Sequence, residues 1–224
     1  MKTIVLSIGG SVVLSKEADT LFLKQMISIL QKHSRKAKLF IVVGGGYIAR
    51  NYIKLGRTLD FNEELLDQIG IDITRINAKI FTNLFESSNK IIPNTTDEAI
   101  KLKNNIIVMG GTTPGHSTDM VGAKLAQKTN ADLFIIATNV DGIYDKDPNI
   151  YKDAILYKKI PIQTLIKNIG TSWESAGKNT VIDGPAIQTI KDSSLKTIVL
   201  NGKQLNQIQN ALEDKPFKGT EITF

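Results

Sequence analysis

The sequence predicts an α/β fold: a three-layer α/β/α sandwich with a mainly parallel central sheet. Short apolar segments alternate with helix-like segments along most of the 224 residues. Strands that are apolar on both faces are typical of a parallel sheet covered by helices on both sides. Three of the apolar segments also end in consecutive glycines, at the strand ends where open α/β sheets bind their ligands.

The first part of the chain predicts regular alternation of strands and helices. The expected strands are 4–8, 39–43, 90–92 and 106–109. The expected helices are 19–31, 47–55, 63–85, 96–102 and a helix from 117 or 118 to 128. Short polar side chains at helix starts accept hydrogen bonds from free N–H groups. Asp19 or Thr20, Asn62, and Ser117 or Thr118 are therefore the expected capping residues.

The second part continues this alternation around a polar, loop-rich stretch from 138 to about 180. The expected strands are 133–137, 197–200 and an edge strand at 221–223, and the expected helices are 162–168, 185–191 and 205–212. The composition shifts near residue 138 without a linker. We therefore expect one domain over 1–224, with two lobes that share a sheet, roughly 1–130 and 131–224.

Composition limits the possible functions. Lys and Arg number 28 against 22 Asp and Glu, a net charge of +6, but the basic residues are scattered and not interleaved with aromatic residues. This favours small anionic substrates over nucleic acid. The chain has no cysteine, which excludes disulfides, thiolate metal sites and a cysteine nucleophile. It has no apolar run long enough to span a membrane, and we expect a cytoplasmic protein.

Glycine pairs and triplets predict phosphate binding. The second glycine turn, 44–46, follows an apolar strand and leads into a helix, so its bare backbone N–H groups suit an anion. Arg50 could add a cationic fork. The first glycine turn, 9–11, and the third, 110–112, share this design. Glycines after a strand also simply reverse the chain, but three such turns favour a site for several phosphates.

The loop after the strand 133–137 has two interpretations. Its Asp-Gly and Asp-Pro pairs are ordinary turn signals. Alternatively, the loop binds a nucleotide: Tyr144 would flank the base, Thr138 and Asn139 would bond the base or ribose, and Asp141 would orient backbone donors or a Mg²⁺ shell.

Two further segments have both a structural and a functional interpretation. Ser117, Thr118 and Asp119 are good helix caps, but Thr118 and nearby N–H groups could instead bind an acceptor monophosphate or its base. His116 could titrate near neutral pH, although transfer to an ionised phosphate needs no base. Asp67 either faces solvent or accepts hydrogen bonds from a ribose diol. No Walker A, protein-kinase or dinucleotide motif is present.

Six segments together resemble the amino acid kinase superfamily, and within it most closely the archaeal-type UMP kinases. They are IVLSIGGSVV (4–13), VVGGGYIARNYIK (42–54), DQIGIDITRINA (67–78), VMGGTTPGHSTD (108–119), ATNVDGIYDKDP (137–148) and AGKNTVID (176–183). The resemblance implies an acceptor lobe over 1–130 and an ATP lobe over 131–224. It also implies transfer of the ATP γ-phosphate to UMP, with Mg²⁺, in pyrimidine nucleotide biosynthesis.

The resemblance also implies roles for individual residues. The UMP contacts would be Gly44, Asp67, Gly115, His116, Ser117, Thr118, Asp119, Met120 and Val121, with Thr118 as the main side-chain contact. The ATP contacts would be Gly9, Gly10, Ser11, Gly45, Arg50, Thr138, Asn139, Tyr144 and Asp147. Arg50 and Asp141 are the predicted catalytic residues, and no protein ligand to a resident metal is predicted.

The sequence departs from the superfamily pattern at two positions. Many members carry a lysine where this chain has Ser7, which shifts charge neutralisation to Mg²⁺ and Arg50. Members often read Asp-Pro where this chain reads Asp183-Gly184-Pro185, and Asp183 is therefore left out of the predicted site.

Alternative functions stay open at this point. One is another kinase of the superfamily; isopentenyl phosphate kinases use a histidine after the triple glycine, and residues 47–51 contain none. Another is a nucleotide-binding sensor or storage protein without turnover. The expected helix 63–85 carries more apolar surface than one lobe needs, on one side along Ile69, Ile73, Ile76, Ile80 and Leu84. We expect part of it to contact a partner subunit, and the resemblance implies a hexamer built from dimers.

Overall fold

The computed structural model of the chain describes residues 1–14, 19–172 and 181–224. The strands within these residues are β1 (Lys2–Ile8), β2 (Ala37–Val43), β3 (Ile106–Met109), β4 (Leu133–Thr138), β5 (Lys159–Pro161), β6 (Thr197–Asn201) and β7 (Gly219–Thr223). The helices are α1 (Gly10–Val13), α2 (Thr20–His33), α3 (Gly46–Thr58), α4 (Glu63–Thr82), α5 (Thr96–Lys101), α6 (Thr118–Lys128), α7 (Ile162–Ile169), α8 (Gly184–Asp192) and α9 (Leu205–Leu212).

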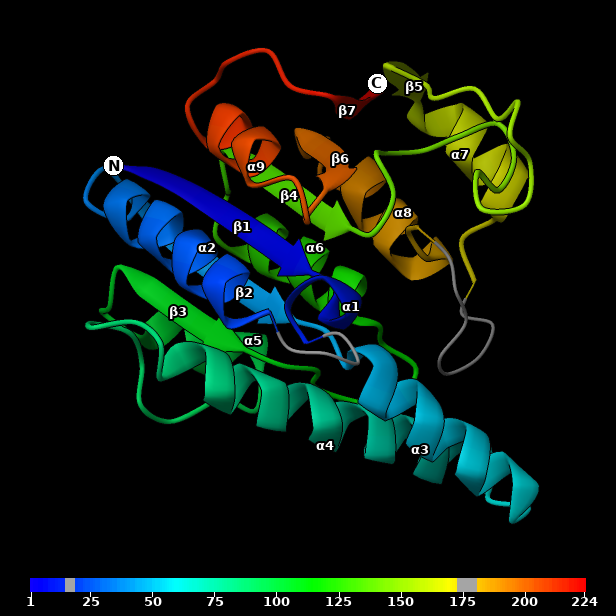
Figure 1. Cartoon of the computed structure of the whole chain (residues 1–224), viewed down its shortest axis with the longest axis horizontal. Coiled ribbons are helices and arrows are strands. Elements are labelled where there is room, and N and C mark those ends of the chain that lie inside the picture. The colour runs from blue at the N-terminus through cyan, green and yellow to red at the C-terminus, as the bar shows by residue number, and fades with distance from the viewer. Residues whose placement is uncertain (15–18, 173–180) are drawn as a thin grey trace.

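The strands form one sheet at the centre of the molecule (Figure 1). Their order across the described part of the chain is β3-β2-β1-β4-β6-β7-β5. Neighbouring strands pair in parallel, except that β7 runs antiparallel to β6. The predicted α/β fold with a mainly parallel sheet is confirmed.

Two apolar cores, one on each face of the sheet, hold the three layers together. Alternate residues of a strand point to opposite faces, so Ile135 packs with α2 and α9 while Phe134 packs with α6 and α8. Figure 1 shows α2 and α9 on one side of the sheet and α5, α6 and α8 on the other. Because both faces are covered, the strands are almost entirely buried.

Three of the side chains that cap helices follow the sequence prediction. The Asp19 carboxylate accepts a hydrogen bond from the backbone N of Phe22 at 2.9 Å. Asn62 caps α4 through the backbone N of Leu65 at 2.9 Å. Ser117 caps α6 through the backbone N of Met120 at 3.0 Å. Each cap contributes about 1 kcal/mol to helix stability and fixes where its helix begins.

The strand expected at 90–92 was wrong. A single bridge pairs Ser88 with Ile106 in that region. The side-chain amide of Asn89 takes the strand's place, because it donates to the Val108 carbonyl at 2.8 Å and accepts from the Val108 N–H at 2.6 Å. One side chain thus satisfies the backbone groups on the outer edge of β3.

The expected edge strand at 221–223 forms, but it does not lie at the edge. It belongs to β7, which lies between β6 and β5. Sequence reasoning missed β5, a strand of 3 residues, because its apolar content is too low to stand out from the polar stretch around it. The short helix α1 was also missed.

The first and second glycine turns meet backbone to backbone. A Cβ added to Gly10 would lie 2.2 Å from the Gly46 nitrogen and 2.5 Å from the Gly44 oxygen. Gly46 has a φ of +66°, a conformation that residues with a side chain rarely adopt. The glycines therefore allow the ends of β1 and β2 to approach one another, in addition to leaving backbone N–H groups bare.

This contact predicts that Gly10→Ala destabilises the fold. The added methyl group cannot be accommodated by a flexible side chain, so the free energy of unfolding should fall by about 1–3 kcal/mol. Gly70→Ala is the matched control, because its Cβ would meet only the Ile53 Cδ1 atom, at 3.4 Å. That variant should be as stable as the wild type or more stable by up to about 1 kcal/mol. Chemical denaturation measures both, and equal stability of Gly10→Ala and wild type would contradict the prediction.

Candidate active site

The carboxyl ends of β1, β2 and β4 open into one cleft. Many of the predicted site residues line it: Gly9, Gly10, Ser11, Gly44, Gly45, Arg50, Asp67, His116, Ser117, Thr118, Asp119, Thr138 and Asn139. They come from segments far apart in the sequence and from both predicted lobes. The cleft therefore brings residues with predicted ATP contacts beside residues with predicted UMP contacts.

The first and second glycine turns supply backbone donors to this cleft. The N–H groups of Gly9 and Gly44 bond to the carbonyl groups of Ala137 and Ile8, each at 2.9 Å, and so tie the turns to the neighbouring strands. The N–H groups that begin α1 and α3 have no acceptor within their own helices. These helix starts are therefore the part of the turns suited to bind phosphate oxygens.

The third glycine turn plays a different part. The N–H of Gly111 donates to the Thr74 hydroxyl at 2.6 Å, and a Cβ on Gly110 would lie 2.7 Å from the same oxygen. Its glycines therefore let α4 pack closely against the end of β3. The same strand-then-glycine pattern serves packing here: Gly111 and Thr74 both line the cleft, but the Gly111 N–H is engaged by Thr74 and is not free for a phosphate oxygen.

Arg50 joins the first and second turns. It lies one turn into α3, and its Nη2 atom donates to the Ser11 hydroxyl at 2.9 Å. The side chain is exposed and lines the cleft. A guanidinium in this place can donate two parallel hydrogen bonds to a phosphate group.

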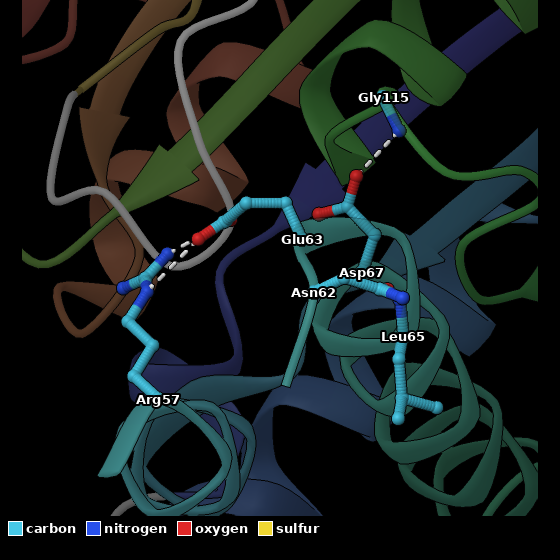
Figure 2. Close-up of polar contacts among 6 residues, drawn as sticks. All are labelled: Arg57, Asn62, Glu63, Leu65, Asp67 and Gly115. Carbon is cyan, nitrogen blue, oxygen red and sulfur yellow. Dashed lines mark hydrogen bonds and ion pairs between the residues drawn. The ribbon is translucent and has the colours of Figure 1, made fainter. Parts of the chain in front are cut away.

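Asp67 reaches from α4 to the loop before α6. Its Oδ2 atom accepts a hydrogen bond from the Gly115 N–H at 2.6 Å, as Figure 2 shows. Gly115 has a φ of +78°, which turns this N–H toward the helix. Nearby, Arg57 and Glu63 form an ion pair at 3.1 Å across the junction of α3 and α4. The carboxylate is thus held at the cleft by a backbone contact instead of turning freely in solvent.

Two carboxyl groups, Asp119 and Asp183, line the same cleft as Arg50 and form an acidic wall. Asp119 accepts a hydrogen bond from the buried Ser7 hydroxyl at 2.6 Å. Asp183 accepts one from the Ser117 hydroxyl and caps α8 through the Ala186 N–H at 3.0 Å. Burial raises the pKa of Asp119 to about 7, and the negative charge of Asp183 adds to this rise. Burial also raises the pKa of Asp183.

His116 is held as a neutral ring. Its Nδ1 atom lies 2.8 Å from the Thr113 hydroxyl. Burial is the main cause that lowers the pKa of His116, the Lys124 ammonium lowers it further, and Asp183 opposes them. A neutral imidazole suits hydrogen bonding to a ligand more than charge neutralisation.

Several predicted site residues do not line the cleft. They are Gly115, Met120, Val121, Asp141, Tyr144 and Asp147. Val121 is 1% exposed and belongs to the apolar core. Met120 accepts a hydrogen bond from the Thr189 hydroxyl at its sulfur, and Asp147 bonds the Asn149 N–H at 2.8 Å in a local turn. Asp141 is held by other side chains, as described below.

Sequence reasoning also missed residues that build the cleft. Asp183 lines the cleft. An aspartate directly before Gly184-Pro185 is a typical helix cap, and this position was the signal in the sequence that could have placed it. Asn77 is buried in α4 and donates to the Gly44 and Gly45 carbonyl groups at 2.8 and 3.1 Å. An amide among apolar helix residues could have signalled this role. Residues 176–180 of the AGKNTVID segment lie outside the described part of the chain.

Within the described residues, no group of three or more His, Cys, Asp or Glu side chains is arranged to hold a metal ion. No helix in this part of the chain is both long and apolar enough to cross a membrane.

Comparison with known proteins assigns the family. Residues 2–201 match the amino acid kinase family. The chain belongs to this family. The match extends from β1 to the end of β6, so the cleft lies on the family's shared fold and β7 lies beyond the matched residues.

Relatives within the amino acid kinase family cover nearly the whole chain. It is 41% identical to a uridylate kinase from Thermoplasma volcanium, over 99% of this chain and 97% of that protein. It is 42% identical to one from Methanobrevibacter smithii, over 98% of each. The crystal structure of uridylate kinase from Archaeoglobus fulgidus has a TM-score of 0.87 and 39% identity, with 100% of both chains covered.

The acidic wall predicts that stability falls as pH rises. The pKa of Asp119 is about 7 in the folded chain, against an ordinary value of 3.8. Between these two pH values, the folded state therefore keeps a proton on Asp119 that the unfolded state has lost. Stability from this group is complete below about pH 4 and is lost as pH rises to about 7. Each pKa unit corresponds to about 1.4 kcal/mol, so the total loss should be on the order of a few kcal/mol.

The measurement is the free energy of unfolding from pH 4 to 8 for the wild type and Asp119→Asn. The variant keeps an acceptor for Ser7 but has no proton to lose, so its stability should fall less over this range. Asp97→Asn is the control, because Asp97 is an exposed aspartate far from the wall. Parallel curves for wild type and Asp119→Asn would rule out the predicted titration.

Proposed function

We propose that the chain is a UMP kinase that transfers the γ-phosphate of ATP to UMP, giving ADP and UDP in pyrimidine nucleotide biosynthesis. One observation carries the proposal. Two glycine turns, their helix starts and Arg50 meet in a single cleft, in a chain whose full-length relatives are named uridylate kinases. A cytoplasmic location follows from this proposal, since both substrates belong to the general nucleotide pool.

The acceptor side of the cleft is proposed to bind UMP. Gly44 lines the acceptor side, and the starts of α3 and of α6 at Ser117 and Thr118 offer N–H groups to the monophosphate. Asp67 is already oriented by the Gly115 N–H, and its other oxygen can accept from the ribose hydroxyl groups. His116, as a neutral ring, can hydrogen-bond the base or the phosphate.

The donor side is proposed to bind ATP. Gly9, Gly10, Ser11 and Gly45 supply backbone contacts to its phosphates, while Thr138 and Asn139 follow β4 at the cleft. Tyr144 and Asp147 lie further along the same loop. The proposed division is an acceptor lobe over 1–130 and an ATP lobe over 131–224, which meet where β1 and β4 pair.

The proposed mechanism depends on positioning and electrostatics. Phosphoryl transfer passes through a loose transition state whose charge spreads over the phosphoryl oxygens. The two glycine turns would hold the attacking UMP oxygen in line with the ATP γ-phosphorus. The Arg50 guanidinium, fixed by Ser11, would lie where the charge develops and stabilise it.

Mg²⁺ is proposed to enter with ATP. The cleft fits this ion, because Asp119 and Asp183 offer the carboxylate oxygens that Mg²⁺ prefers, and the ion commonly uses one or two carboxylates together with substrate phosphates. When bound, it would neutralise phosphate charge, a need made greater by Ser7 in place of a lysine. The chain itself would hold these two carboxyl groups in the same cleft as Arg50.

ADP release in a coupled assay tests the proposed function. The rate of ADP release should be higher with UMP than with CMP, carbamate or isopentenyl phosphate. Arg50→Ala should reduce kcat at least about 100-fold, because it removes a cation that acts on the transition state, while circular dichroism shows an intact fold. Arg35→Ala, an exposed arginine outside the cleft, is the control and should behave as the wild type.

The outcomes separate the alternatives. Turnover with another acceptor in place of UMP would indicate a different kinase of the family. Nucleotide binding without ADP release would indicate a sensor or storage protein. Wild-type turnover by Arg50→Ala would reject the catalytic role of that residue.

The exposed side of α4 supports a homo-oligomer. Ile76 and Ile80 of α4 are 54% and 48% exposed, and Leu84, two residues beyond its end, is 41% exposed, whereas the opposite side of α4 packs on the sheet through Ala78 and Phe81. Neighbouring exposed apolar side chains on one helix mark a contact surface. We propose that this row pairs subunits into dimers, which assemble into a homohexamer.

Ile76→Glu should disrupt this proposed assembly. The new charge would be buried without a partner at the subunit contact, which strongly opposes association. Light scattering after size exclusion at micromolar concentration should show a smaller mass than the wild type. Leu21→Glu alters a residue of similar exposure on α2, 66% exposed, and should keep the wild-type mass. A monomeric wild type would contradict the proposal.

A further inference from the structure

The Asp141 carboxylate is held by several donors outside the cleft. Its Oδ1 atom accepts from the side-chain amides of Asn201 and Gln204, each at 3.0 Å. Its Oδ2 atom lies 2.5 Å from the Lys218 ammonium. The Tyr144 hydroxyl is a further partner. Both oxygens of the carboxylate are therefore engaged by protein donors, and the carboxylate does not line the cleft where phosphates would react.

The partners of Asp141 come from separate segments. Asn201 ends β6, Gln204 precedes α9 and Lys218 precedes β7. The hydrogen bond from Lys218 is the largest cause that keeps the pKa of Asp141 below its usual range, with Asn201 next among the partners that lower it and burial opposing them. One ionised side chain therefore links the loop after β4 to three other elements.

A second contact joins the same loop to β7. The Thr220 hydroxyl accepts from the Ile143 N–H at 2.8 Å and donates to the Tyr157 carbonyl at 2.6 Å. A Cβ on Gly142 would lie 2.5 Å from that hydroxyl oxygen, so the loop lies directly against the strand. The loop is thus fixed to β7 on both sides of Gly142.

We propose that Asp141 and Lys218 are positioning residues for the donor nucleotide. The loop they fix begins at Thr138 and Asn139, which line the cleft, and continues to Tyr144. This inference rests on the proposed function, because these residues are its proposed ATP contacts. Lys218 contacts neither substrate in this arrangement and acts through the loop. Asp141, predicted from the sequence to be catalytic, has the same indirect role.

The ion pair orients the loop more than it stabilises the fold. The Lys218 side chain is 56% exposed and that of Asp141 is 18% exposed, and ion pairs open to solvent contribute little to stability. Loss of Lys218 leaves Asp141 with its amide partners and Ile143 with Thr220, but removes the charged contact that orients the Asp141 end of the loop. ATP affinity should therefore change while global stability and UMP affinity do not.

The test is the Kd for ATP, measured by isothermal titration calorimetry in the presence of Mg²⁺, together with KM and kcat. Lys218→Met should weaken ATP binding about fivefold, the effect of losing one charge-assisted contact, and raise KM for ATP with kcat unchanged. Lys218→Arg should restore most of the affinity. Lys203→Met removes an exposed lysine from the neighbouring turn before α9 and should bind ATP as the wild type does.

Each outcome decides the inference. Unchanged ATP affinity in Lys218→Met would overturn it. Equal weakening of ATP and UMP binding, or a large drop in melting temperature, would show a general structural role and also overturn it. Failure of the proposed function is distinguishable, because the wild type would then bind ATP without phosphorylating UMP.

Discussion

The contact between Gly10 and the backbone of Gly44 and Gly46 is the constraint on which the cleft depends. Because no side chain separates the first and second glycine turns, the ends of β1 and β2 meet at backbone distance. The starts of α1 and α3 consequently face the same space. Arg50 can then reach Ser11 from the next element along the chain. A larger residue at the contact would separate all of these groups at once.

The electrostatics of the cleft follow from what surrounds these turns. Arg50 provides positive charge to the cleft, and Asp119 and Asp183 provide carboxyl groups to it. Ser7 is fully buried and meets Asp119 with a hydroxyl group, where a lysine would have met it with a charge. Burial and the charge of Asp183 raise the pKa of Asp119, and the hydrogen bond from Ser7 opposes them.

Local patterns allowed much of the fold to be predicted from the sequence. Apolar runs identified the main parallel strands, and Asp19, Asn62 and Ser117 identified helix starts, because these signals are contained within a few residues. The predicted strand at 90–92 failed because the Asn89 side chain, and not a backbone segment, covers β3. The position of β7 inside the sheet was not predictable, since alternation along a strand does not reveal its neighbours.

The same limit applied to the site. The three glycine turns look alike in sequence, but the Thr74 hydroxyl engages the Gly111 N–H of the third, and only tertiary packing decides this. Asp183 was set aside because an extra glycine follows it, yet it still caps α8 at the cleft. The sequence did not reveal the amide partners of Asp141, because Asn201 and Gln204 lie 60 or more residues away along the chain.

The place of β7 in the sheet also has a consequence for synthesis on the ribosome. β5 pairs with β7, so residues 159–161 cannot join the sheet until residues 219–223 have left the exit tunnel. The nascent chain can therefore assemble β1 to β4 first, while the residues of β5 stay unpaired. During this interval the risk that the chain aggregates through unpaired strands is greatest.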